Sequence, residues 1–399
     1  MNNRTLLAAL VAGGFAIATS GPVVAADLGG DCCADLEERV ADLEATTVRK
    51  GNRKVSVKIY GQVARALMFW DNGRDNDVYN VDNDSSTTRI GLRGKAKINS
   101  NWEAGYRIEF GVHSAESDRV DEVNDDGDGS RIVLRRSALY IAKKGAHGKL
   151  KMEIGLASHG NDGVAKSDLG GTNDIGRNGG LRYIEDFRLF TTAGALAAGG
   201  LDWDRLFPGD LELDRDDVVR LEWSMPENGL GKVKLAASWG EDDEYSFGIF
   251  IGGKASSIKY DLRAGYGIDD EGPRTEIYNG SISFLETGTG LFVTVSGGVR
   301  ERDNTNTEEE FYQLKGGIKQ KWWSYGKTTL YGEFIETDID TNGAAIGGEG
   351  EIYGFGIVQK IDAAAMTLYA GYREYEATSD IGEDLEDFRT IVTGAKIKF

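Results

Sequence analysis

The feature that most constrains the fold is a long alternation of apolar and polar residues from residue 54 to residue 399. In residues 101–113, for example, the even-numbered positions from Trp102 to Val112 are apolar, and Glu103 and Arg107 lie between them. A period of two places the two sets on opposite faces of a β-strand. Many of these runs reach about ten residues, the length that a tilted strand needs to cross a bilayer, whereas soluble strands average about five or six.

The alternation predicts many strands joined by connections of two kinds. Short connections, such as 99–101 and 252–253, alternate with longer polar ones, as periplasmic turns and external loops do in membrane barrels. The predicted fold is therefore all-β, a sixteen-stranded antiparallel transmembrane β-barrel over residues 54–399. The expected strands are 54–70, 87–99, 101–113, 131–143, 149–158, 216–225, 232–240, 245–254, 256–268, 274–286, 290–302, 309–322, 326–337, 350–361, 364–376 and 386–399.

The composition agrees with this fold and argues against a nucleic-acid-binding protein. The chain has 55 glycines and only 4 prolines, which suits long hydrogen-bonded strands. Its mean hydropathy of −0.37 resembles that of a soluble protein, but alternating strands average to a polar value. The net charge of −19 argues against a nucleic-acid surface.

The first residues have the pattern of an export signal. Arg4 precedes an apolar run over 6–17, and small residues follow at 24–26, so residues 1–26 are predicted to be a signal peptide. Cys32 and Cys33 are adjacent and can oxidise after export, which favours bonds to other subunits, although free thiols remain an alternative. Lipidation is disfavoured because Asp31 stands where a small residue is needed.

Residues 27–50 are predicted to be a periplasmic coiled-coil trimerisation segment. Apolar or small residues recur at spacings of four and three in 34–50, the seam of a short coiled coil. An Arg and a Glu flank this seam as in a trimerisation motif, and a loose amphipathic leader is the alternative. The proposed trimer contacts are Leu36, Arg39, Val40, Leu43 and Glu44.

Two local patterns give further expectations. Strand 131–143 carries apolar residues on both faces, as a strand at a subunit contact would. Aromatic residues near strand ends are expected to form interfacial girdles. They are Tyr60, Trp70, Trp102, Trp239, Trp322, Trp323, Tyr325 and Tyr372.

The two ends of the mature chain carry a resemblance. The leader over 31–40, the entry Gly51-Asn52-Arg53-Lys54 and the terminal Phe399 together resemble the alphaproteobacterial (Hyphomicrobiales-type) trimeric general porins of the outer membrane. The resemblance implies a homotrimer with one water-filled pore per subunit and a third external loop folded inward. A barrel of this kind is also expected to contact outer-membrane lipid and lipopolysaccharide, the latter through divalent ions bound by the acidic run 124–129 as one alternative. Phe399 would be read by the barrel assembly machinery, and the coiled coil would reach peptidoglycan or a periplasmic partner.

The longest connection, 159–215, is the third external loop of this topology, and loops of this length are usually functional or disordered. We expect it to constrict the pore and to face a basic wall, so that a transverse field decides ion preference. Each residue could instead be merely solvated, and the net acidity favours cations. The acidic candidates are Asp162, Asp168, Asp174, Glu185 and Asp186, beside Arg177, Arg182 and Arg188. The basic wall is Arg89, Arg93, Lys95, Lys97 and Arg107.

The expected function is passive diffusion of small hydrophilic solutes and ions, with no cofactor and no metal. A channel specific for a sugar or an anion, a structural envelope barrel and an outer-membrane enzyme are alternatives. Only His113, His147 and His159 could serve catalysis or metal binding, and none lies beside a recognisable motif. The acidic run 124–129 lacks the spacing of a calcium loop and is expected to be a solvated loop.

Overall fold

The computed structural model describes residues 54–127, 129–176, 183–209, 211–213, 216–241, 243–270, 274–303, 307–341 and 346–399. All of them belong to one compact unit, Thr47–Phe399. The predicted signal peptide, the coiled-coil segment with its trimer contacts, Cys32 and Cys33 lie outside the described residues. Within the described ranges, no helix is both long enough and apolar enough to cross a membrane.

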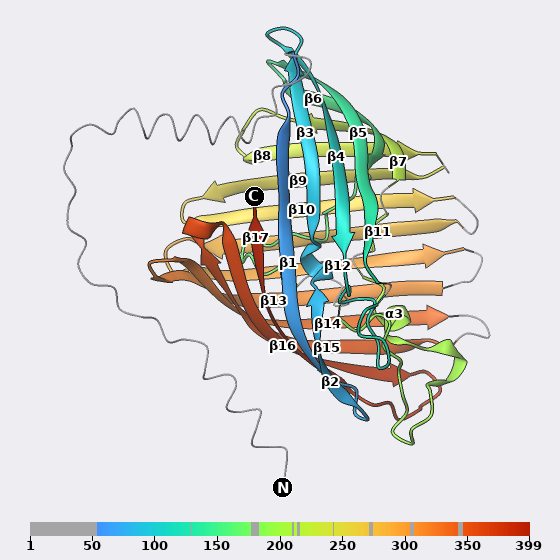
Figure 1. Cartoon of the computed structure of the whole chain (residues 1–399). Helices are drawn as coiled ribbons and strands as arrows, with labels where there is room; N and C mark the ends of the chain where they lie inside the picture. The colour runs from blue at the N-terminus through green and yellow to red at the C-terminus, as the bar shows by residue number, and fades with distance from the viewer. Residues whose placement is uncertain are drawn as a thin grey trace, which may run out of the picture. The chain divides into compact units, whose positions relative to one another are not determined.

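The regular secondary structure of the described chain is almost entirely β-strand (Figure 1). Three short 3-10 helices, η2 (Asp84–Ser86), η3 (Ala198–Gly200) and η4 (Asp362–Ala364), and one helical turn, α3 (Trp203–Leu206), interrupt it. The strands are β1 (Lys58–Asp71), β2 (Asn76–Asp82), β3 (Arg89–Lys97), β4 (Trp102–His113), β5 (Arg131–Gly145), β6 (Gly148–Ala157), β7 (Asp216–Ser224), β8 (Lys232–Gly240), β9 (Tyr245–Ala255), β10 (Ile258–Asp269), β11 (Thr275–Glu286), β12 (Leu291–Arg302), β13 (Thr307–Trp323), β14 (Gly326–Thr341), β15 (Gly348–Ile361), β16 (Met366–Ser379) and β17 (Phe388–Lys398).

Hydrogen bonding closes these strands into a ring. Each strand is antiparallel to its neighbours, and β17 pairs with β1 from Gln62 opposite Lys398 to Asp71 opposite Arg389. β2 and β3 pair with successive parts of β1, so with η2 between them they make one interrupted strand. The barrel is therefore sixteen-stranded, as predicted. The sequence prediction found the β3 part of the interrupted strand and missed β2.

The register separates two faces around the whole ring. Residues opposite one another share a face, and the set that contains Lys396 on β17 continues through Thr367 on β16 and Lys360 on β15. This set faces the lumen, because the opposite set is the apolar, exposed one. The other set is apolar and exposed, as expected of the lipid-facing band. It includes Val63, Leu67, Ile90, Leu92, Leu134, Leu139, Ile282, Val293, Val295, Leu314 and Leu330.

The predicted aromatic girdle is correct in part. Trp239, Trp322, Trp323 and Tyr325 are exposed on the described surface. Tyr60 instead donates a hydrogen bond to Glu109 on the lumen face, and Trp70 is buried in the core. A position near a strand end does not decide the face of a residue; the parity of the residue within the strand does.

Strand β5 corrects the expectation of two apolar faces. The register between β4 and β5 shifts between Glu109 and Phe110, so an extra residue of β5 is inserted near Arg135 and Arg136. A bulge moves all following side chains to the opposite face. As a result Ile132, Leu134, Leu139 and Ile141 are all exposed on the outer side. The strand therefore has one apolar face, and the bulge shifts the alternation of apolar and polar residues by one position.

Candidate functional site: the third loop and the facing wall

The connection between β6 and β7 begins by attaching to the lumen face of β8 and β9. The backbone N–H of Gly160 donates to Ser238 Oγ at 3.0 Å and to Ser246 Oγ at 2.6 Å. His159 is fully buried; its Nδ1 lies 3.1 Å from Ser238 Oγ and its Nε2 3.0 Å from a carboxylate oxygen of Glu244. The third loop therefore enters the barrel interior.

This Ser238–His159–Glu244 chain was not predicted, because its members are far apart in sequence. It has the residue types of a hydrolase triad. Ser238, however, is only 8 % exposed, and its hydroxyl already engages Gly160, His159 and Ser246. These contacts make it a buried anchor for the start of the loop.

The loop then follows the inner wall across the next strands. The N–H groups of Ser167 and Leu169 donate to Ser281 Oγ and Ser283 Oγ on β11 at 3.0 and 3.1 Å. Further around the ring, Lys319 of β13 donates to the Leu169 carbonyl and Thr329 of β14 donates to the Gly170 carbonyl, both at 2.9 Å. Inward-facing serine, threonine and lysine side chains thus satisfy loop backbone groups that would otherwise be buried without partners.

Two of the predicted acidic residues hold the loop in shape. Asp168 accepts hydrogen bonds from the N–H groups of Gly171, Thr172 and Asn173, which makes a tight turn. Asp174 forms an ion pair with Lys396 of β17 and lies 3.6 Å from Lys360. Burial raises the pKa of the Asp174 carboxyl, but these lysines outweigh burial and hold that pKa below its ordinary value.

The remaining acidic candidates lie closer to solvent. Asp162 is 3.7 Å from Arg136 on the facing strand β5. Asp186 is exposed and lies 3.7 Å from Arg119, and Glu185 beside it is half-buried. Of the three arginines named beside these acidic candidates, Arg188 pairs with Glu122 at 3.2 Å, whereas Arg177 and Arg182 lie outside the described residues.

The second half of the loop packs into an apolar cluster inside the barrel. Trp203 stacks on Phe207 with ring centroids 6.2 Å apart, and Phe187 meets Phe388 of β17 edge-on at 4.8 Å. The sequence offered a signal for this cluster, because the inward positions of several late strands are apolar where a water-filled lumen predicts polar residues. The strand residues in contact are Met68, Trp70, Tyr79, Tyr331, Ile335, Ile352, Tyr375, Phe388 and Val392.

The predicted basic wall lies on one lumen face. Arg93 pairs in register with Arg107, and Lys95 and Lys97 follow on the same face. Arg107 donates to Glu109 at 2.6 Å and to Tyr60 at 2.7 Å. Arg93, Lys95 and Lys97 are exposed although they face inward, so solvent reaches this side of the lumen. The remaining member, Arg89, joins the same face beside Gln62 of β1.

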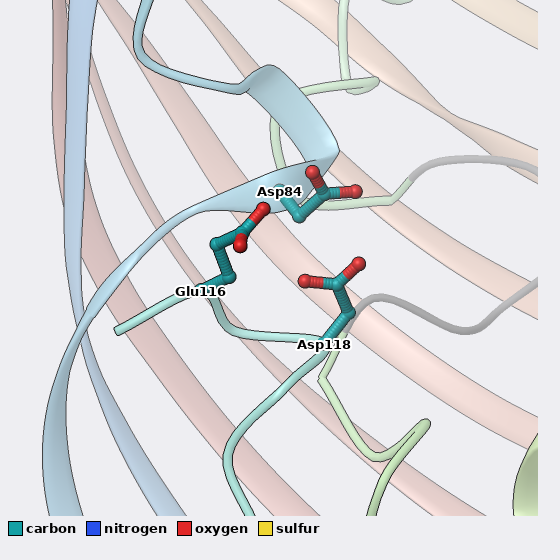
Figure 2. Close-up of side chains that lie close together, drawn as sticks. All are labelled: Asp84, Glu116 and Asp118. Carbon is teal, nitrogen blue, oxygen red and sulfur yellow. The ribbon is translucent and has the colours of Figure 1, made fainter. Parts of the chain in front are cut away.

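Three carboxylates gather near η2, a grouping that the sequence did not indicate. Asp84, Glu116 and Asp118 each place an oxygen within 4.8 Å of the others (Figure 2). Glu116 also pairs with His113 and, at 2.6 Å, with Arg131, which offsets part of the negative charge. His113, which the sequence offered as a candidate for catalysis or metal binding, therefore belongs to a group of ionisable residues that holds the segment after β4 in place.

Comparison with known proteins shows which class of proteins shares the fold of this chain. No family model matches the sequence, and no curated protein matches it. Solved structures that match include the anion-selective porin from Comamonas acidovorans, at a TM-score of 0.57 and 14% identity over 86% of this chain and 100% of that chain. OmpT, an outer membrane protein of Vibrio cholerae, matches at 0.55 and 14% over 88% and 99%. The outer membrane channel DcaP of Acinetobacter baumannii matches at 0.55 and 13% over 88% and 99%.

At these identities the comparisons establish the fold, which is the sixteen-stranded barrel of outer-membrane channels and porins. The chain's own features agree with that setting. Its outer face is an exposed apolar band, and all strand edges are paired around the ring, as a bilayer requires. The chain is an outer-membrane β-barrel.

Proposed function

We propose that this protein is a porin, a non-enzymatic channel that lets small hydrophilic solutes and ions diffuse passively through a water-filled pore. The observation that carries the proposal is the third loop, bound along the lumen face from β8 to β17. A loop fixed at this level narrows a barrel without closing it, because the opposite wall keeps exposed Arg93, Lys95 and Lys97. Sixteen-stranded porins are wide enough to hold both a loop and an aqueous channel.

The constriction is proposed to lie between this loop and the basic wall. Asp186 is exposed and Asp162 is partly exposed, and each lies 3.7 Å from an arginine, so we assign them to the acidic side. On the wall, Arg107 pairs with Glu109 of its own strand. Asp168 and Asp174 instead hold the loop in shape, the first through a tight turn and the second through its ion pair with Lys396. Opposed charges across the opening would set a transverse field.

The oligomer is proposed to be a homotrimer held through the 27–50 segment. The leader 31–40 and the terminal Phe399 support assignment to the alphaproteobacterial general porins, and one solved OmpT structure of Vibrio cholerae is described as a trimer form. Replacing Leu36 and Leu43 with Asp should shift the protein toward monomers in native gels while the barrel stays folded. A trimer unaffected by both changes would assign trimerisation to the barrel wall. Phe399 is proposed as the signal that the barrel assembly machinery reads. We also propose that the barrel contacts lipopolysaccharide and that the coiled coil contacts peptidoglycan or a periplasmic partner.

Planar-bilayer recording tests the channel itself. The expected result is a large ohmic conductance that appears in three equal steps. Complete absence of conductance would contradict the proposal. Block of the current by low concentrations of one sugar or one anion would favour a specific channel instead.

A further inference from the structure

The lumen carries a set of lysines near the end of the barrel where the short turns lie. That end faces the periplasm in barrels of this kind. The register places these lysines on the lumen face, and all are exposed. We name this set the inner lysine rim: Lys95, Lys97, Lys144, Lys254, Lys259 and Lys398.

Members of the rim stand directly opposite other cations on neighbouring strands. Lys254 faces Lys259, and Lys144 faces Lys149. Like charges directly opposite one another destabilise a sheet.

The carboxylates at this level already have basic partners. Glu103 accepts from Lys149 at 2.7 Å, and Asp261 pairs with Arg263 at 2.6 Å. Glu222 lies 3.7 Å from Lys234. Glu103 also stands opposite Lys97 in register and lies near Lys95 and Lys144, so it offsets part of the rim's charge. Lys254 and Lys259 face each other, and their own register partners on β9 and β10 are both cations.

Part of the chain's negative charge lies on the outer face of the barrel. Outward-facing carboxylates fill neighbouring strands toward the other end of the barrel, where Glu310 faces Asp338 and Asp338 faces Glu349. Glu336 likewise faces Glu351 on the same outer side. These charges are separated from the lumen by the barrel wall, so the net charge of the chain is not the charge that a permeating ion meets.

We propose that the pore selects anions, and that the inner lysine rim binds small polyvalent anions such as inorganic phosphate weakly and reversibly. Rings of Lys and Arg are the usual selectivity elements of anion and phosphate pores. Paired ammonium groups favour a doubly charged anion over chloride, because both members of each pair interact with it. The inference rests on the proposed channel function.

The reversal potential of single channels in a potassium chloride gradient measures this preference. Wild-type protein should conduct chloride better than potassium. The variant Lys254→Gln/Lys259→Gln removes one facing pair and should lower the chloride-to-potassium permeability ratio by roughly two- to threefold per charge, as expected for charges several ångströms from the ion in water. Inorganic phosphate should reduce the chloride current through wild-type channels more than through this variant.

Lys144→Gln removes one cation of the pair that Lys144 forms with Lys149 and should also lower the ratio. Lys143→Gln is its matched control. Lys143 is adjacent in sequence but points outward over the Trp102 ring at 5.5 Å, so its replacement should leave the ratio unchanged. A cation-selective or unselective wild-type channel would overturn the inference while leaving the porin function intact, as would equal ratios for the wild type and the double variant. A protein with no conductance would overturn the proposed function itself.

Discussion

Asp174 of the third loop forms an ion pair with Lys396 of the last strand, two residues separated by 222 positions in sequence. Lys396 also donates to Ser86 of η2 at 2.8 Å. One lysine thus joins the loop, the closing strand and the interrupted strand. The position of the loop in the lumen depends on strand pairing at the point where the barrel closes.

Replacing Asp174 with Asn should loosen this junction. Lys396 would remain buried with a neutral partner, and breaking a buried pair costs about 3–5 kcal/mol. We expect a lower thermal midpoint in detergent and noisier single-channel currents. Asp162→Asn is the control, because its two cationic partners are 3.7 Å away and Asp162 is partly exposed. Equal losses for the two variants would contradict the assigned role.

The same pair predicts a dependence on acid. The pKa of Asp174 in the folded protein lies below its ordinary value, which is about 4 for aspartate. The stabilisation is therefore complete above about pH 4 and disappears as the pH falls through the lower pKa of the folded state. Wild-type channels should become noisier in this acid range. Asp174→Asn channels should be noisy at neutral pH already and change less on acidification.

The aromatic cluster should carry much of the loop's stability. Phe187→Ala removes a ring packed against Trp70 at 4.9 Å and Phe388 at 4.8 Å. Such core truncations cost about 3–5 kcal/mol. We expect faster trypsin cleavage within the third loop and a larger conductance, because the loop leaves the wall. Phe355→Ala, at an outward residue that is 63% exposed, should leave both measurements unchanged.

The variant Ser238→Ala tests whether Ser238 anchors the start of the third loop or acts as a catalytic nucleophile. The Gly160 N–H would keep Ser246 as an acceptor, whereas His159 would lose its hydroxyl partner in a buried site. A loss of about 1–3 kcal/mol in unfolding free energy is expected. Purified wild-type protein should hydrolyse a nitrophenyl ester no faster than the variant. Ester hydrolysis by the wild type that the variant lacks would restore the enzyme alternative.

The outer carboxylates should destabilise the barrel at low salt. Asp338 stands between Glu310 and Glu349 on neighbouring strands. Asp338→Asn should therefore raise the thermal midpoint, by the equivalent of about 0.2–1 kcal/mol for each relieved pair. Salt screens exposed charges, so the gain should shrink as ionic strength rises. A gain that is independent of salt would point to another cause.

The sequence by itself determined the barrel, because side-chain alternation is a local property of the strand. Residues such as Leu92 and Arg93 differ in polarity and adjoin in sequence, which is enough to assign opposite faces. The same reasoning located sixteen strands and the long loop after β6. It missed β2, whose seven residues are too few to show a clear alternation.

Only the tertiary structure decided which charges meet. Asp168 and Asp174 looked like pore-lining acids, yet one caps a turn and the other pairs with a lysine 222 residues away. The grouping of Ser238 with His159, the cluster around Trp203 and the facing pair Lys254–Lys259 likewise depend on closure and register. These relationships join residues of distant strands, and a net charge of −19 cannot show that Asp338 and its neighbours Glu310 and Glu349 face outward while the lysines of the rim face the lumen. Local periodicity fixes the face of each residue, and only the closed ring fixes its neighbours.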